Sequence, residues 1–127
     1  MLAISTQGGV PTILLNPVSA ANTAAATSLW VAVPAWEGDV VVTQQTGAIT
    51  GTLNAILETA DDGSGTNNRT VTFVDATAAF TAVSAANKIE KKVVDRKSLG
   101  THVKYTGTVV TGPVLIALSM VGVPKTA

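Results

Sequence analysis

The sequence predicts an all-β protein, an antiparallel β-sandwich of about eight strands with a jelly-roll-like arrangement. Short runs rich in Val, Ile, Leu and Thr recur along the 127 residues, and turns rich in Gly, Asp and Asn separate them. Runs at spacings of roughly 8–15 residues are typical of sandwiches and jelly rolls. The length indicates one domain. We therefore expect a flexible arm over residues 1–9 and a single sandwich domain over residues 10–127.

The first two strands are expected at Val10–Leu15 and Leu29–Val33. Asn16-Pro17 closes the first strand and Pro34 closes the second, because proline cannot donate to a strand ladder. The Ala-rich stretch Val18–Ser28 favours a helix by propensity. It is short and has no apolar period of three to four residues, so we expect an extended or irregular segment there.

Six more strands are predicted from apolar runs bounded by turn residues. They are Asp39–Gln45, Thr52–Thr59, Arg69–Asp75, Lys88–Asp95, His102–Thr108 and Val114–Val121. The segments Asp61–Asn68 and Ala76–Asn87 are expected as surface loops. Val114–Val121 is apolar on both faces, which favours a central strand or one covered by another subunit.

The two tryptophans have different expected places. Trp30 lies within a predicted strand and is expected in the core. Trp36 follows the turn at Pro34, which favours the edge of the core or an interface, where exposed tryptophan is enriched.

Composition narrows the function classes. Cysteine is absent, which excludes disulfides, thiolate metal sites and cysteine nucleophiles. Only 13% of residues are charged, against a typical value of about 25%, and a weakly charged surface favours burial in an assembly. We find no signal-peptide pattern and no membrane-spanning run, so we expect synthesis in a cytoplasm and no membrane partner.

The charges are segregated along the chain. Six acidic residues lie between Glu37 and Asp75, and six of the eight basic residues lie between Lys88 and Lys104. One interpretation is an ordinary solvated surface with internal pairing; the other is a basic patch that docks on an acidic partner. Nucleic-acid binding is not expected, because Tyr105 is the single aromatic residue in this region and two acids interrupt it.

No catalytic or metal-binding set is apparent in the sequence. His102 is the only histidine and lacks the partners of a triad, so we expect it to face solvent from a strand. Asp61-Asp62-Gly63-Ser64 has a superficial likeness to a calcium loop but no later acid, which favours a plain hairpin loop. We therefore expect a protein that is not an enzyme and that uses no cofactor or metal.

Several segments resemble small proteins that are encoded beside the major capsid protein of tailed bacteriophages and that decorate, or cement, the capsid. The matching segments cover roughly residues 37–121. They are Glu37–Val42, Thr50–Leu53, Leu57–Gly63, Phe80–Val83, Val93–Arg96 and His102–Thr108.

This resemblance implies a jelly-roll-like sandwich, usually a homotrimer, at three-fold or quasi-three-fold sites on the capsid exterior. Such a protein is made in the host bacterial cytoplasm, and its partner is the major capsid protein. From exposure and charge we expect the contacts to come from the N-terminal arm, one tryptophan and a basic set. The candidate interface residues are Gly8, Gly9, Trp36, Lys88, Lys91, Lys92 and Lys97.

Two alternatives stay open at this point. One is a tail, fibre or adhesin-like module of the virion that recognises a ligand on the host surface. The other is a small cell-wall hydrolase, which the lone histidine, absent cysteine and sparse carboxylates disfavour.

Overall fold

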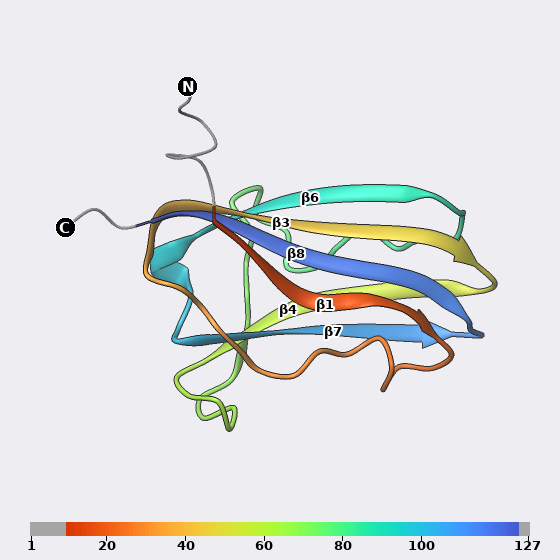
Figure 1. Ribbon diagram of the computed structural model, residues 1–127, viewed down its shortest axis with the longest axis horizontal. Coiled ribbons are helices and arrows are strands. Elements are labelled where there is room, and N and C mark those ends of the chain that lie inside the picture. The colour runs from red at the N-terminus through yellow and green to blue at the C-terminus, as the bar shows by residue number, and fades with distance from the viewer. Residues whose placement is uncertain (1–9, 125–127) are drawn as a thin grey trace.

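The computed structural model describes residues 10–124, and these form two antiparallel four-stranded sheets packed face to face (Figure 1). The predicted all-β sandwich is confirmed. The expected arm at residues 1–9, including Gly8 and Gly9, lies outside the described residues. The strands are β1 (Val10–Ala20), β2 (Val31–Ala32), β3 (Trp36–Ile49), β4 (Thr52–Ala60), β5 (Arg69–Thr70), β6 (Lys88–Asp95), β7 (His102–Val110) and β8 (Val114–Pro124), with one short 3-10 helix, η1 (Arg96–Ser98).

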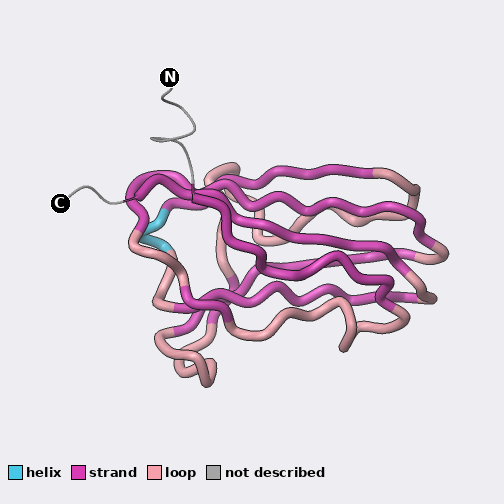
Figure 2. Tube along the Cα trace, viewed as in Figure 1, coloured by secondary structure: helices cyan, strands magenta, loops and turns pink. Residues whose placement is uncertain are grey.

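The pairing of the strands is nested. Sheet A has the order β1-β8-β3-β6 and sheet B the order β2-β7-β4-β5. The first strand pairs with the last, the second with the seventh, the third with the sixth and the fourth with the fifth, all antiparallel. This is the pattern of one long two-stranded ribbon rolled into two sheets, which is a jelly roll. Most loops therefore gather at the two ends of the sandwich (Figure 2).

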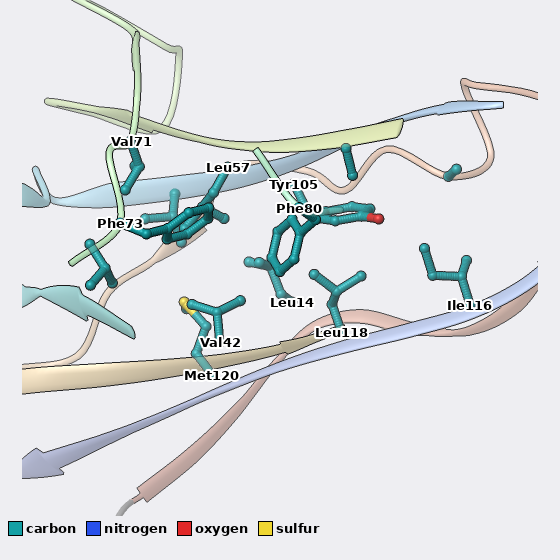
Figure 3. Close-up of a cluster of buried hydrophobic side chains, with 14 of the residues drawn as sticks. Leu14, Val42, Leu57, Val71, Phe73, Phe80, Tyr105, Ile116, Leu118 and Met120 are labelled. Carbon is teal, nitrogen blue, oxygen red and sulfur yellow. The ribbon is translucent and has the colours of Figure 1, made fainter. Parts of the chain in front are cut away.

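Alternation of apolar and polar residues builds the core between the sheets. On β4, Leu53, Ala55 and Leu57 are buried, as the sequence predicts. The facing strands contribute Val42, Ile116, Leu118 and Met120 (Figure 3). Three aromatic rings continue the core in edge-to-face contacts, with centroid separations of 5.3 Å for Phe73 and Phe80 and 5.8 Å for Phe80 and Tyr105.

The segment between β5 and β6 closes one side of the sandwich. Its backbone donates hydrogen bonds to β4 from Val71, Phe80 and Val83, and Val74 donates to Val93 of β6. The predicted strand at Arg69–Asp75 is wrong beyond Thr70, although its alternation is real because Val71 and Phe73 are buried. Along the chain the segment contacts β4 at Val71, then β6 at Val74, and then β4 again at Phe80 and Val83, so it forms no continuous ladder.

Other strand boundaries differ from the prediction. β1 continues through Asn16-Pro17 to Ala20, with register shifts before Leu15 and after it. Proline is tolerated there because β1 is the edge strand of sheet A and a bulge absorbs the missing donor. β3 begins at Trp36 instead of after it, and Gly38 takes a positive φ of 74° within an irregular stretch of the ladder.

The second predicted strand contracts to Val31–Ala32. Trp30 lies outside it and is half-buried, so its expected place in the core is wrong. The Lys104 ammonium lies 5.5 Å from the centre of the Trp30 ring. Gly65 packs on the same indole so closely that a Cβ there would lie 2.9 Å from Nε1. Trp30 is therefore held by surface groups on the outside of sheet B.

Candidate assembly surfaces

The outer face of sheet A is the surface that points away from the core. On β8 the buried residues Val114, Ile116, Leu118 and Met120 face inward, so the intervening side chains face outward. The same alternation holds on β3 and β6. The central rows of this face consist of Val41, Thr43, Gln45 and Gly47 of β3, Ile89, Lys91 and Val93 of β6, and Leu115, Ala117, Ser119 and Val121 of β8.

The strand register arranges these side chains in rows across the sheet. Val41 lies between Val93 and Val121, and Gln45 lies between Ile89 and Ala117. Thr43 lies between Lys91 and Ser119. Lys91 is the one charged side chain in these central rows of the described chain. A sheet face in water is ordinarily polar, so a face with this composition is unusual.

No described segment of the chain covers this face. Ile13, Ile89 and Leu115 on it remain 60%, 64% and 45% exposed. The final strand β8 is central in its sheet, as predicted, and its outward side chains still reach the surface. Large apolar side chains that share one exposed face mark an interaction surface.

The outer face of sheet A is also hollowed. A shallow hollow of about 510 Å³ is lined by the small residues Gly47 and Ala117, by larger apolar residues such as Ile89 and Leu115, and by polar residues such as Asn87. A smaller hollow of about 150 Å³ adjoins it and shares Pro17, Gln45 and Ala117. A Cβ at position 47 would lie 3.3 Å from the Cβ of Leu115, so a larger residue there would crowd Leu115 in the lining of the hollow. The hollow can take an apolar side chain from another molecule.

The outer face of sheet B has a different character. Glu58 lies opposite Lys104 on neighbouring strands, and the hydroxyl of Thr106 donates to Oε1 of Glu58 at 2.8 Å. His102 faces outward on the same sheet, as predicted, and is half-buried, with Nδ1 2.9 Å from the hydroxyl of Thr101. This face is polar and internally paired, with Ile56 among its few apolar members.

The loop between β4 and β5 saturates its own carboxylates. Asp62 accepts hydrogen bonds from the backbone N–H groups of Ser64 and Thr66 and from the Thr66 hydroxyl. Asp61 accepts from Asn67 and Arg69. These hydrogen bonds, above all those from Thr66 and from Asn67, hold the pKa values of Asp62 and Asp61 below the usual range. Over residues 10–124, no cluster of three His, Cys, Asp or Glu residues could hold a metal ion.

The structure divides the candidate interface lysines. Lys88 and Lys91 on β6 and Lys97 in η1 are exposed, as expected. They do not form one patch, because Lys91 points outward from sheet A while Lys88 and Lys97 flank opposite ends of β6.

Lys92 is buried, with 8% of its surface exposed, so its selection as an exposed contact is wrong. Its ammonium group lies 2.8 Å from Oδ2 of Asp75 and 3.5 Å from Oε2 of Glu90, and 5.6 Å from the centre of the Phe73 ring. The hydrogen bond from Lys92, reinforced by Thr77, holds the pKa of Asp75 far below its usual range. Lys92 thus anchors the segment after β5 onto β6.

Trp36 is also buried, with 4% of its surface exposed, so it is no surface contact of the described structure. It packs on Gly122 of the neighbouring strand β8, where a Cβ would lie 2.1 Å from Cδ2 of the indole. The glycine makes room for the ring at this end of the core. The sequence signal for this contact is weak, because the partner lies at the far end of the chain.

Nested strand pairing in two four-stranded sheets defines a protein of the jelly-roll class, with one sheet face left open by the described chain. Among solved structures, the fold is similar to that of the SPBc2 prophage-derived protein YomS. The TM-score is 0.54 and the identity 14%, over 90% of this chain and 93% of that one. At this identity the likeness shows a shared fold. No protein-family model matches the chain, and no curated protein sequence matches it.

One further finding concerns membranes. None of the described residues belongs to a helix that is long and apolar enough to cross a bilayer.

Proposed function

We propose that this protein is a structural component of a bacteriophage particle that decorates and stabilises the capsid by bridging major capsid proteins. The observation that carries the proposal is the outer face of sheet A, which is low in charge, hollowed and uncovered by the described chain. A surface of this kind suits permanent assembly. The fold shared with a prophage-derived protein supports a phage origin.

The mechanism we propose is binding without chemistry. Many copies, each a homotrimer on the exterior of the shell, span joints between capsid subunits. Each joint gains a modest binding free energy, and the bound state of the shell is favoured by mass action and multivalency. No catalytic step, cofactor or metal takes part. The protein is made in the bacterial cytoplasm and joins the particle there.

Two kinds of surface are available for assembly. The exposed lysines Lys88 and Lys97 offer charge for attraction to an acidic capsid surface, which would raise association rates at low salt. The outer face of sheet A offers apolar area for a lasting contact, which would dissociate slowly.

The proposal is tested with shells assembled without this protein. Purified protein is added, the shells are sedimented, and the bound copies per shell are counted. We expect saturable binding at hundreds of copies and a higher temperature of shell disruption. Copy counting in virions also tests the alternative: a few copies per particle would indicate a tail or fibre module instead. No binding to shells would contradict the decoration role.

A further inference from the structure

We infer that the outer face of sheet A is covered by a second copy of this chain and not by the capsid shell. The inference adds to the proposed function by assigning a partner to this face. It rests on the proposed function only in naming the capsid shell as the other partner. It concerns which partner takes which surface: the chain itself takes the apolar sheet face, and the exposed charges remain for the other partner.

The first argument is the composition of the face. Side chains in its rows are apolar, small or hydroxyl-bearing apart from the amide of Gln45, with Lys91 as the one charge in the central rows of the described residues. Depletion of charge and enrichment in apolar area are typical of permanent interfaces between identical subunits. If this face bound the shell instead, it would stay exposed to water until a shell forms. Because only 13% of the residues are charged, charge repulsion would then protect the chain little against aggregation.

The second argument is area. Four strands spaced by about 4.8 Å and about nine residues long give a flat footprint of roughly 600 Å² before side-chain relief is added. A stable interface of standard size buries about 800 Å² on each partner. The outer face of sheet A alone therefore comes close to the area that a lasting contact between two copies needs.

The third argument is complementarity of shape and charge. The face carries both a hollow, lined in part by Gly47 and Ala117, and an exposed apolar side chain, Ile13, so one copy can supply what another accepts. The face has charges of both signs: Lys91 lies in its central rows, and Asp39 and Asp95 lie opposite each other at its border, where β3 and β6 meet η1. Two copies can thus offset each other's charges.

The test uses two matched variants of the full chain. Thr43→Glu puts a carboxylate in the middle of the outer face of sheet A, directly opposite Lys91, where a cross-strand pair of opposite charge favours the folded monomer. Thr108→Glu makes the same change on the exposed outer face of sheet B, opposite Asn54. Light scattering coupled to size-exclusion chromatography gives the mass of each protein, and circular dichroism checks the fold.

We expect the unmodified chain and Thr108→Glu to elute at the same multiple of 12.8 kDa, and Thr43→Glu at 12.8 kDa. The dissociation constant should rise by on the order of 100-fold, because covering the face would remove water from the new carboxylate and from Lys91 beside it. Gln45→Glu, nearly isosteric and on the same face, should act in the same direction and serves if Thr43→Glu fails to fold. The measured mass also distinguishes three copies from two.

Two results would overturn the inference: a monomeric unmodified chain at every concentration, or an unchanged multiple for both sheet A variants. Shell sedimentation of the same proteins keeps the two proposals apart. If Thr43→Glu loses shell binding while the unmodified chain is monomeric, the shell covers this face. If no protein binds shells while the masses follow our expectation, the decoration role fails and the contact between copies stands.

Discussion

The phenolic hydroxyl of Tyr105 donates a hydrogen bond of 2.6 Å to Oε1 of Gln44 across the interior of the sandwich. Tyr105 belongs to β7 of sheet B and Gln44 to β3 of sheet A, and both are buried. Burial, with a smaller contribution from the charge of Glu90, raises the pKa of Tyr105 well above its ordinary value. The bond has a defined geometry, so it restrains how one sheet is placed over the other.

Tyr105→Phe should lower the free energy of unfolding by about 1–3 kcal/mol, because the carbonyl of Gln44 would be left buried without its donor. Urea unfolding followed by circular dichroism measures the change. A double-mutant cycle with Gln44→Leu should return a coupling of about 1 kcal/mol. Purely additive effects of the two substitutions would show that the bond contributes nothing to the stability.

Gly122→Ala should destabilise the protein by about 1–3 kcal/mol through overpacking, because its Cβ would lie 2.1 Å from the Trp36 ring. Gly63→Ala is the matched control, since that glycine is exposed and its nearest contact would be an ordinary 3.4 Å from the His102 ring. Thermal unfolding compares the two. An equal change of the unfolding temperature in both variants would mean that the Trp36 ring can move aside.

Acid should weaken the anchor between Lys92 and Asp75. The pKa of Asp75 is lowered in the folded protein, so the stability it contributes is present above the unfolded pKa of about 3.9 and is lost as the pH falls below that value. The urea midpoint of the unmodified protein should therefore decrease from pH 5 towards pH 2.5. Asp75→Asn and Lys92→Met should each be less stable at pH 7 and should each show a smaller decrease, and an unchanged pH profile in both would contradict this account.

Shell attachment should depend on the exposed lysines. Lys88→Glu combined with Lys97→Glu should keep the fold, since both side chains are exposed, and should lower occupancy of shells most strongly at low salt. Lys91→Glu combined with Lys92→Glu is expected to unfold the protein instead, because a carboxylate at position 92 would face Asp75 and Glu90. Sedimentation with shells and circular dichroism distinguish these results. Full occupancy by the first double variant at every salt concentration would exclude these lysines from the contact.

Alternation along single strands predicted much of the fold. β6 has the predicted bounds, and the buried positions of β4 and β7 follow directly from the period of two. When both faces of a strand contain apolar and polar residues, alternation alone does not predict which face packs on the core. On β6 the side with Glu90, Lys92 and Val94 faces inward, although the other side contains Ile89 and Val93. The segment after β5 supplies the carboxylate of Asp75 for Lys92, and this contact joins residues that are far apart in the sequence.

The candidate site was harder to predict for the same reason. The outer face of sheet A joins residues from strands that are far apart in the chain, such as Ala117 and Gln45, and only the nested pairing places them in one row. Among the single strands, Val114–Val121 is apolar on both faces, but that pattern predicts a central strand as well as a covered one. The sequence does show a low charge content, which pointed to assembly without indicating a surface.

The backbone of Val10, where β1 begins, lies beside Gly122, near the end of β8. The fold is therefore defined by which strands pair, and the same pairs can form in a chain whose strands follow one another from a different starting point. A short linker could join Pro124, where β8 ends, to Val10, and new ends could be opened in the exposed loop Asp61–Asn68, leaving every strand pair in place. A circularly permuted chain would carry its ends at that loop, on the β4–β5 side of the sandwich, where a fused peptide could be displayed without touching the open face of sheet A.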